Sequence, residues 1–198
     1  MNHLAHALLA APDEDLMLGG LIADFVRGHV DPRLPRGVRH GIALHRSIDV
    51  FTDAHADVVA ARALFEPPFR RYAGILLDVW FDHRLARQWD RFGTGSLHAF
   101  SHEVQALLVR RQAEVPAEMH GFVRYLLAHD LPGRYRERDA IEHALRGIAT
   151  RLSRANPLAG AMPVLECHAA AIEPHFTAFF PQLAAHARAE RERLDAMP

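Results

Sequence analysis

The chain of 198 residues is 49% apolar and 24% charged, an ordinary composition for a globular protein with one sizeable core. Its net charge of −1 argues against a general nucleic-acid-binding protein, and no stretch approaches the roughly 18 apolar residues of a membrane span. A single cysteine, Cys167, excludes an intrachain disulfide and a cysteine-based zinc site. We therefore expect one cytoplasmic domain, residues 1–198, that binds neither nucleic acid nor membrane.

The spacing of apolar residues along the chain predicts an all-α fold. Almost every segment has a 3.6-residue period, and no run of alternating β-branched residues bounded by turns occurs. Proline and glycine separate the segments, as at Glu66-Pro67-Pro68 and Leu131-Pro132-Gly133. The predicted helices cover residues 2–10, 15–27, 36–51, 54–65, 69–91, 96–113, 117–130, 135–153 and 158–193. This pattern indicates a multi-helix bundle with a long C-terminal helix.

Four of these helices carry polar side chains on faces that are otherwise apolar. In chain order these are Asn2 and His6 in the first helix, Asp24 in the second, His45 and Asp49 in the third, and Asp78, Asp82 and His83 in the fifth. Residues four apart lie one turn apart, so they share a face of their helix. A buried carboxylate is costly unless a positive group pairs with it. A positive group is therefore expected where these faces meet.

Each of these side chains, taken singly, also has a structural explanation. A lone His on an apolar face is more often a hydrogen-bonded core residue than a ligand, and a lone Asp often pairs with a nearby Arg. Acids and histidines that converge from four helices instead match a cluster of divalent cations, whose charge makes the burial tolerable. Without a thiolate, the donor set fits Mn²⁺, Fe²⁺ or Mg²⁺ at least as well as Zn²⁺. The pattern predicts a metal centre and metal-assisted hydrolysis of a phosphoester.

Other polar pairs are interpreted as structural. His98 and His102 are expected to be solvated, and His129-Asp130 ends a predicted helix, where a His complements the negative helix terminus. Cys167 has no base or orienting partner in the sequence, which argues against a nucleophile. No glycine-rich phosphate-binding loop occurs.

Four sequence blocks in the first 90 residues resemble the acyl carrier protein phosphodiesterases, also called ACP hydrolases. The blocks are MNHLAHALLA, GGLIADFVRG, GIALHRSIDVFTD and LLDVWFDHRLARQW, in this order and at close spacing. The resemblance implies an all-helical, Mn²⁺-dependent enzyme with an HD-domain-like fold, a divergent relative of the HD-type metal phosphohydrolases. Such an enzyme hydrolyses the phosphodiester that joins 4′-phosphopantetheine to the serine of holo-acyl carrier protein, and releases the apo-carrier.

The family's motif positions coincide with all eight polar side chains above and also include Arg46 and Asp53. Residues 82 and 83 read Asp-His rather than His-Asp, so the resemblance leaves open which atoms bind which metal. Carrier proteins are acidic, so a docking surface rich in Arg is expected. The arginines available for it are Arg33, Arg36, Arg39, Arg70, Arg71, Arg87 and Arg91.

The resulting hypothesis gives each residue a role. The expected metal ligands are His6, Asp24, His45, Asp78 and Asp82. Asp24 also counts as catalytic, and His83 or Asp49 would orient the attacking water or protonate the departing serine oxygen. The substrate phosphate would be bound by Asn2, Arg27, Arg46 and Arg84.

Two other functions remain compatible with the same residues. An HD-like phosphohydrolase that acts on a nucleotide or another small phosphoester would turn over substrates that lack a protein carrier. A non-catalytic helical protein that binds a metal or a partner would hydrolyse no phosphodiester. Assays with and without a carrier protein separate these possibilities.

Overall fold

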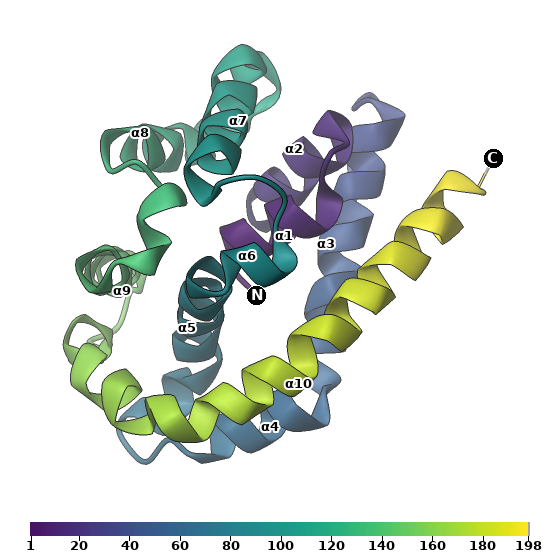
Figure 1. The fold of residues 1–198 in the computed structure, drawn as a ribbon. Coiled ribbons are helices and arrows are strands. Elements are labelled where there is room, and N and C mark those ends of the chain that lie inside the picture. The colour runs from purple at the N-terminus through teal and green to yellow at the C-terminus, as the bar shows by residue number, and fades with distance from the viewer. Residues whose placement is uncertain (198) are drawn as a thin grey trace.

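A computed structural model of the protein describes residues 1–197, which form ten α-helices and six short 3-10 turns (Figure 1). The α-helices are α1 (His3–Ala10), α2 (Glu14–Ile22), α3 (Arg36–Ala54), α4 (Ala56–Ala63), α5 (Ala73–Arg87), α6 (Trp89–Phe92), α7 (Leu97–Arg110), α8 (His120–Ala128), α9 (Arg138–Arg151) and α10 (Met162–Asp195). The 3-10 turns are η1 (Ala23–Phe25), η2 (Phe69–Tyr72), η3 (Gln112–Glu114), η4 (Ala117–Met119), η5 (Gly133–Arg136) and η6 (Leu158–Gly160). The predicted all-α class and the long C-terminal helix are confirmed, whereas the HD-domain-like arrangement stays a prediction.

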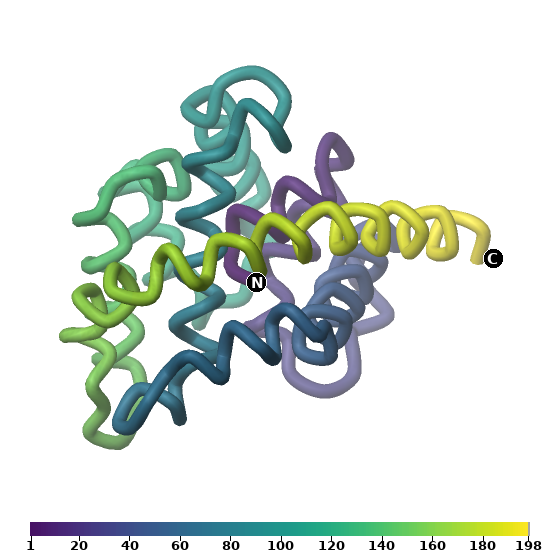
Figure 2. Tube along the Cα trace, turned by 60° about the horizontal axis from the view of Figure 1, so that its bottom comes forward, coloured from purple at the N-terminus to yellow at the C-terminus, as the bar shows by residue number. Residues whose placement is uncertain are grey.

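Helix α5 runs through the middle of the fold, where it contacts α1, α4, α9 and α10 (Figure 1). Helix α10 lies along α3 and α4, and its C-terminal end extends to the edge of the molecule in both views (Figures 1 and 2). The N-terminus instead lies at the centre of the molecule in both views, and Met1 is buried. Among residues 1–197, every helix is either too short or too polar to cross a bilayer.

Two predicted helices are interrupted although their apolar pattern continues. The helix expected over 15–27 stops at Ile22, and a 3-10 turn follows over Ala23–Phe25. The helix expected over 69–91 is divided, because Gln88 has a non-helical backbone (φ −107°, ψ 25°) between α5 and α6. The first difference matters for function, because it places Asp24 in a turn rather than inside a helix.

Two glycines allow α2 and α3 to approach each other closely. A Cβ atom on Gly19 would overlap the carbonyl oxygen of Val38, and one on Gly41 would overlap the carbonyl oxygen of Leu16. The two backbones therefore touch at this point, where no side chain fits. Helix α2 leads directly into η1, which carries Asp24, and α3 carries His45 and Asp49. The contact between the two helices therefore fixes the position of Asp24 relative to His45 and Asp49.

We expect Gly19→Ala to lower the free energy of unfolding by about 1–3 kcal/mol, the usual cost of forcing atoms into a filled contact. Gly147→Ala in α9 is a matched control, because nothing lies within 4 Å of the added methyl group. That control should be neutral or stabilising by roughly 0.5–1 kcal/mol, because Ala favours the helix interior over Gly. Urea denaturation measures both values. Equal stability of the two variants would contradict the close contact of α2 and α3.

Candidate metal centre

His45 of α3 stands at the centre of a cluster of polar side chains. Its Nδ1–H donates a hydrogen bond of 2.7 Å to the carbonyl oxygen of Gly20. This bond turns Nε2 toward two carboxylates, 3.1 Å from Asp49 Oδ2 and 3.3 Å from Asp24 Oδ1. Burial acts to lower the pKa of His45, but hydrogen bonding to Asp24 and Asp49 outweighs burial and raises this pKa to about 9. An imidazole whose Nδ1–H is fixed on a backbone carbonyl has the orientation common among metal-binding histidines.

His6 of α1 stacks on His45, with ring centroids 3.7 Å apart and an angle of 15° between the ring planes. Its side chain is buried, and neither ring nitrogen makes a hydrogen bond of normal geometry, although Nε2 lies 3.2 Å from Asp49 Oδ1. Burial, followed by the charge of His45, lowers the pKa of His6 to about 3. The ring is therefore neutral and keeps a lone pair for a ligand.

One ligand atom from each of His6, His45 and Asp49 lies within 4.8 Å of the others. A buried imidazole without a hydrogen bond is unfavourable, and a cation between the three side chains would satisfy it. Two imidazoles and a carboxylate are also a donor set that divalent metals accept. These residues therefore fit a metal ion.

Asp49 of this cluster and two neighbouring carboxylates remain accessible. The side chains of Asp24, Asp49 and Asp78 are 61%, 41% and 38% exposed. The hydrogen bond from His45 lowers the pKa of Asp24 to about 2. The ammonium group of Met1 lies 3.1 Å from Asp78 Oδ1 and 3.7 Å from Asp49 Oδ1. The positively charged ammonium group of Met1 thus lies between the carboxylates of Asp49 on α3 and Asp78 on α5.

Asp82, in contrast, contacts α1 rather than the accessible carboxylates. Its side chain is fully buried, and its two oxygens accept backbone N–H groups of Leu4 at 2.8 Å and Ala5 at 3.2 Å. These N–H groups belong to the first turn of α1, which has no acceptor of its own because Asn2 makes no side-chain cap. Burial raises the pKa of Asp82 to about 7, against the lowering effect of the two backbone bonds. Asp82 therefore caps α1 from a distant part of the chain.

His83 and Arg84, which the sequence predicts to be site residues, point to other parts of the fold. The Nδ1–H of His83 donates to the carbonyl oxygen of Tyr135 at 2.8 Å, and burial lowers the pKa of His83. Arg84 forms an ion pair of 2.5 Å with Glu173 of α10. The carboxylates of Asp24, Asp49 and Asp78 open into a cleft, and neither His83 nor Arg84 lines it.

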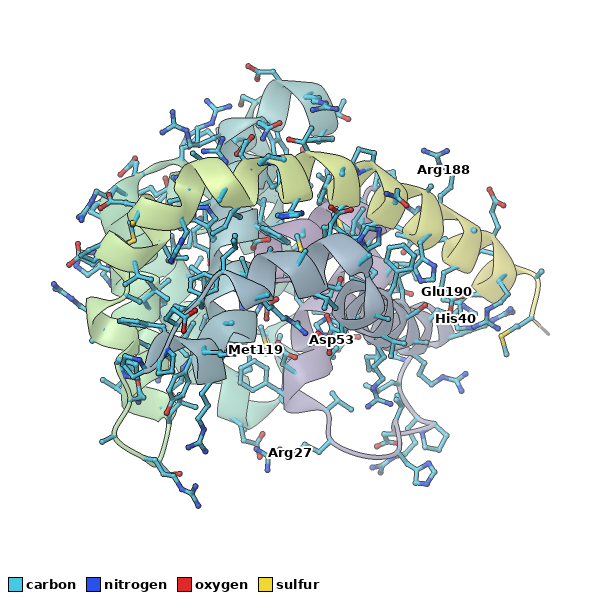
Figure 3. All side chains as sticks on the ribbon, turned by 90° about the horizontal axis from the view of Figure 1, so that it is seen from below. Arg27, His40, Asp53, Met119, Arg188 and Glu190 are labelled. Carbon is cyan, nitrogen blue, oxygen red and sulfur yellow. The ribbon has the colours of Figure 1, made fainter. Side chains whose placement is uncertain are left out.

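Arg46 and Arg27 also lie outside this cleft. The guanidinium of Arg46 donates to the carbonyl oxygens of Val26 at 2.9 Å and Gly28 at 3.1 Å, so it holds the loop that follows η1. Arg27 is exposed on the same loop at the edge of the molecule (Figure 3). The arginines expected to bind phosphate are therefore engaged elsewhere or directed into solvent.

The carboxylates open into a cleft of about 340 Å³. It is lined by Met1, Asn2, His3, Asp24, Phe25, Asp49, Asp53, Ile75, Asp78, Val79, Ile148 and Arg151. The volume falls within the range of small-molecule sites. The cleft therefore brings Asn2 and three of the expected acids together with two residues of α9.

Arg151, at the C-terminal end of α9, is a cleft residue that no sequence motif indicates. It is the single arginine lining the cleft within residues 1–197, and none of the ion pairs formed by these residues includes it. Its guanidinium carbon lies 5.6 Å from the ring centroid of Phe122, and His3 packs against the same ring with centroids 4.5 Å apart. From the sequence, Arg151 is only a basic residue at a helix end, where such residues are common.

The arginines expected to dock a carrier protein are spread over the fold. Arg87 lies nine residues beyond Asp78 on α5, about 13 Å farther along the helix axis. Arg70 and Arg71 in η2 are exposed and precede Ile75, which lines the cleft. Of the predicted docking residues, Arg70 and Arg71 are therefore nearest in sequence to a residue that lines the cleft.

Comparisons with known proteins agree on one family. A family model described as acyl carrier protein phosphodiesterase matches residues 1–183. Proteins of that name from Yersinia pestis and Photorhabdus laumondii are each 36% identical over 184 residues, or 92% of this chain and 95% and 93% of theirs. The protein of the same name from Escherichia coli O157:H7 is 37% identical over 188 residues, covering 94% of this chain and 97% of the relative. No solved structure matches the chain.

Proposed function

The chain belongs to the acyl carrier protein phosphodiesterase family and is a phosphoric diester hydrolase, and from this premise we propose that it removes 4′-phosphopantetheine from the serine of holo-acyl carrier protein. The reaction would use a divalent cation, with Mn²⁺ preferred over Fe²⁺ and Mg²⁺. The main support for the metal is the neutral, buried His6, whose ring nitrogens make no hydrogen bond of normal geometry although it stacks on His45 and approaches Asp49.

In this proposal the cation is held by His6, Asp24, His45 and Asp49. A divalent cation there would supply charge that activates water and stabilises the negative phosphoryl oxygens. Asp49 enters the ligand set because it approaches both histidines, at 3.2 and 3.1 Å. Asp82 leaves it because both of its oxygens are occupied by N–H groups of α1. Asp78, also predicted as a ligand, leaves it because its carboxylate pairs with the ammonium group of Met1.

The remaining cleft residues would bind the substrate. Arg151 offers a guanidinium without an acidic partner in the same cleft as Asp24 and Asp78, and such a group binds phosphate oxygens. Stacking on Phe122 holds this guanidinium in place. The Asn2 amide, which caps no helix, is free to hydrogen-bond the substrate. His83 has no contact with the cleft and supports the packing of α5 against η5.

Arg151→Ala should lower kcat/KM for holo-acyl carrier protein by roughly 10- to 100-fold. Hydrogen bonds to charged groups contribute about 1.5–3 kcal/mol, and about 1.4 kcal/mol corresponds to a factor of ten. Arg154→Ala is the matched control, since Arg154 is an exposed arginine three residues later that does not line the cleft. Steady-state kinetics at saturating Mn²⁺ measure the difference, and equal losses in the two variants would remove Arg151 from the phosphate site.

Intact-mass spectrometry of holo-acyl carrier protein, after incubation with the protein in the presence and absence of Mn²⁺, tests the proposed reaction. We expect the carrier to lose one phosphopantetheine group only when the metal is present. The same preparation is assayed with bis(4-nitrophenyl) phosphate, a small phosphodiester. Hydrolysis of that compound with an unchanged carrier mass would favour a small-phosphoester hydrolase, and loss of the group without metal would refute the metal requirement.

A further inference from the structure

A pair of histidines on α7 lies apart from the cleft and has no role in the proposed reaction. His98 and His102 are four residues apart, so they share one face of the helix, and their ring centroids are 4.3 Å apart. Both side chains are exposed. Two histidines at this spacing on a helix present their ring nitrogens side by side, as metal-binding helices do.

Asp130, from the turn after α8, supplies a carboxylate to the same place. Its Oδ2 atom lies 3.8 Å from His98 Nδ1. Its Oδ1 atom accepts a hydrogen bond of 3.0 Å from the amide of Gln105, which also donates to the carbonyl oxygen of Leu131 at 3.0 Å. Asp130 has a φ of 50°, the one positive φ among the non-glycine residues in 1–197. Its carboxylate is therefore oriented by a neighbouring side chain, as carboxylates that bind metals are.

The distances fit a transition-metal ion. One ligand atom from each of the three residues lies within 4.8 Å of the others. A tetrahedral Zn²⁺ with bonds of about 2.0–2.2 Å needs donor atoms roughly 3.3–3.6 Å apart, so the separation between His98 and Asp130 requires only a small change. Because the two histidines are exposed, their rotamers can supply the rest of the movement.

We propose that His98, His102 and Asp130 form a second metal site, which binds Zn²⁺ or a related late transition metal with water as a further ligand. Two imidazoles and one carboxylate favour Zn²⁺, Ni²⁺ or Cu²⁺ over Mn²⁺ by the general order of divalent affinities. The bound ion joins α7 to the turn that follows α8, two segments that no disulfide connects. The site is separate from the cleft, because none of its three residues lines it.

Isothermal titration of the full chain with ZnCl₂, after loading with Mn²⁺, tests this site, because any exchange of Zn²⁺ for Mn²⁺ at the first centre is the same in the wild type and in variants of the second site. Relative to the wild-type chain, His102→Ala should lose one equivalent of bound Zn²⁺ or bind it at least about tenfold more weakly. His29→Ala, which removes an exposed histidine elsewhere, is the control and should bind as the wild type does. Gln105→Ala keeps all three ligands, and an affinity reduced by about 10- to 100-fold would show that Gln105 orients Asp130.

A second readout separates this site from the catalytic one. Zn²⁺ should raise the unfolding temperature of the Mn²⁺-loaded wild type more than that of His102→Ala. Hydrolysis of holo-acyl carrier protein with Mn²⁺ should be equal in the two proteins. Identical Zn²⁺ affinity and stoichiometry in the wild type and His102→Ala would overturn the proposal, whatever the outcome of the carrier assay.

Discussion

Asp49→Ala should lower kcat/KM for holo-acyl carrier protein by about 10³-fold or more while the helical content stays unchanged. Asp49 is the carboxylate that approaches both His6 and His45, so its loss removes the proposed ligand shared by α1 and α3. Losing several kcal/mol of transition-state stabilisation corresponds to this range, at about 1.4 kcal/mol for each factor of ten. Steady-state kinetics with Mn²⁺ and the metal content of the purified variant measure the effect.

Asp90→Ala is the matched control for this experiment. Asp90 lies on α6, and its side chain is 96% exposed. Its removal should change neither activity nor bound Mn²⁺. If Asp49→Ala retained metal and wild-type turnover, the proposed centre would be wrong, because no other acid contacts both histidines among the ion pairs of residues 1–197.

Asp82→Ala should lower the free energy of unfolding of the metal-free chain by about 2–4 kcal/mol, or roughly 5–15 °C in Tm for a chain of this length. The variant leaves the backbone N–H groups of Leu4 and Ala5 without an acceptor in a fully buried position. Asp82→Asn keeps one acceptor oxygen and should lose less. Urea denaturation in the presence of a chelator measures both variants.

Asp13→Ala is the reference variant, because it measures how much unfolding free energy is lost when an exposed helix cap is removed. Asp13 caps α2 within its own helix, where it accepts the N–H of Leu16 at 2.9 Å at an exposed position. Its loss should cost only about 1 kcal/mol, since water can replace the acceptor. If Asp82 were instead a metal ligand, both Asp82 variants would lose bound Mn²⁺ and keep the stability of the metal-free wild type.

The sequence predicts the helices well because their signals are local. Apolar residues at helical spacing and proline or glycine breaks lie within each segment, and all nine predicted segments contain helix in the structure. The same periodicity places His6, His45 and Asp49 on inner faces, and these faces meet in the fold. The end of α2 at Ile22 has no such local signal, because the apolar pattern continues past it while the backbone tightens into a 3-10 turn.

The partner of each polar side chain could not be predicted, because it comes from a distant part of the chain. Asp82 and His83 are neighbours in sequence, yet one caps α1 and the other bonds to Tyr135. Arg84 is of a residue type that commonly binds phosphate, but its charge is neutralised by Glu173 of α10. Arg151 reaches the cleft only because α9 packs against α5, and no motif in the first 90 residues indicates this contact.

The lining of the cleft has a further consequence for how such a chain can diverge. Its acids and His3 come from the first 78 residues, whereas Ile148 and Arg151 come from α9. Under the proposed assignment, the first part of the gene encodes the metal ligands, and a later part encodes the guanidinium that binds the phosphate. Exchanging α9 between relatives would then alter phosphate binding while the metal centre persists. Metal binding and phosphate binding would thus be inherited on separable stretches of one chain.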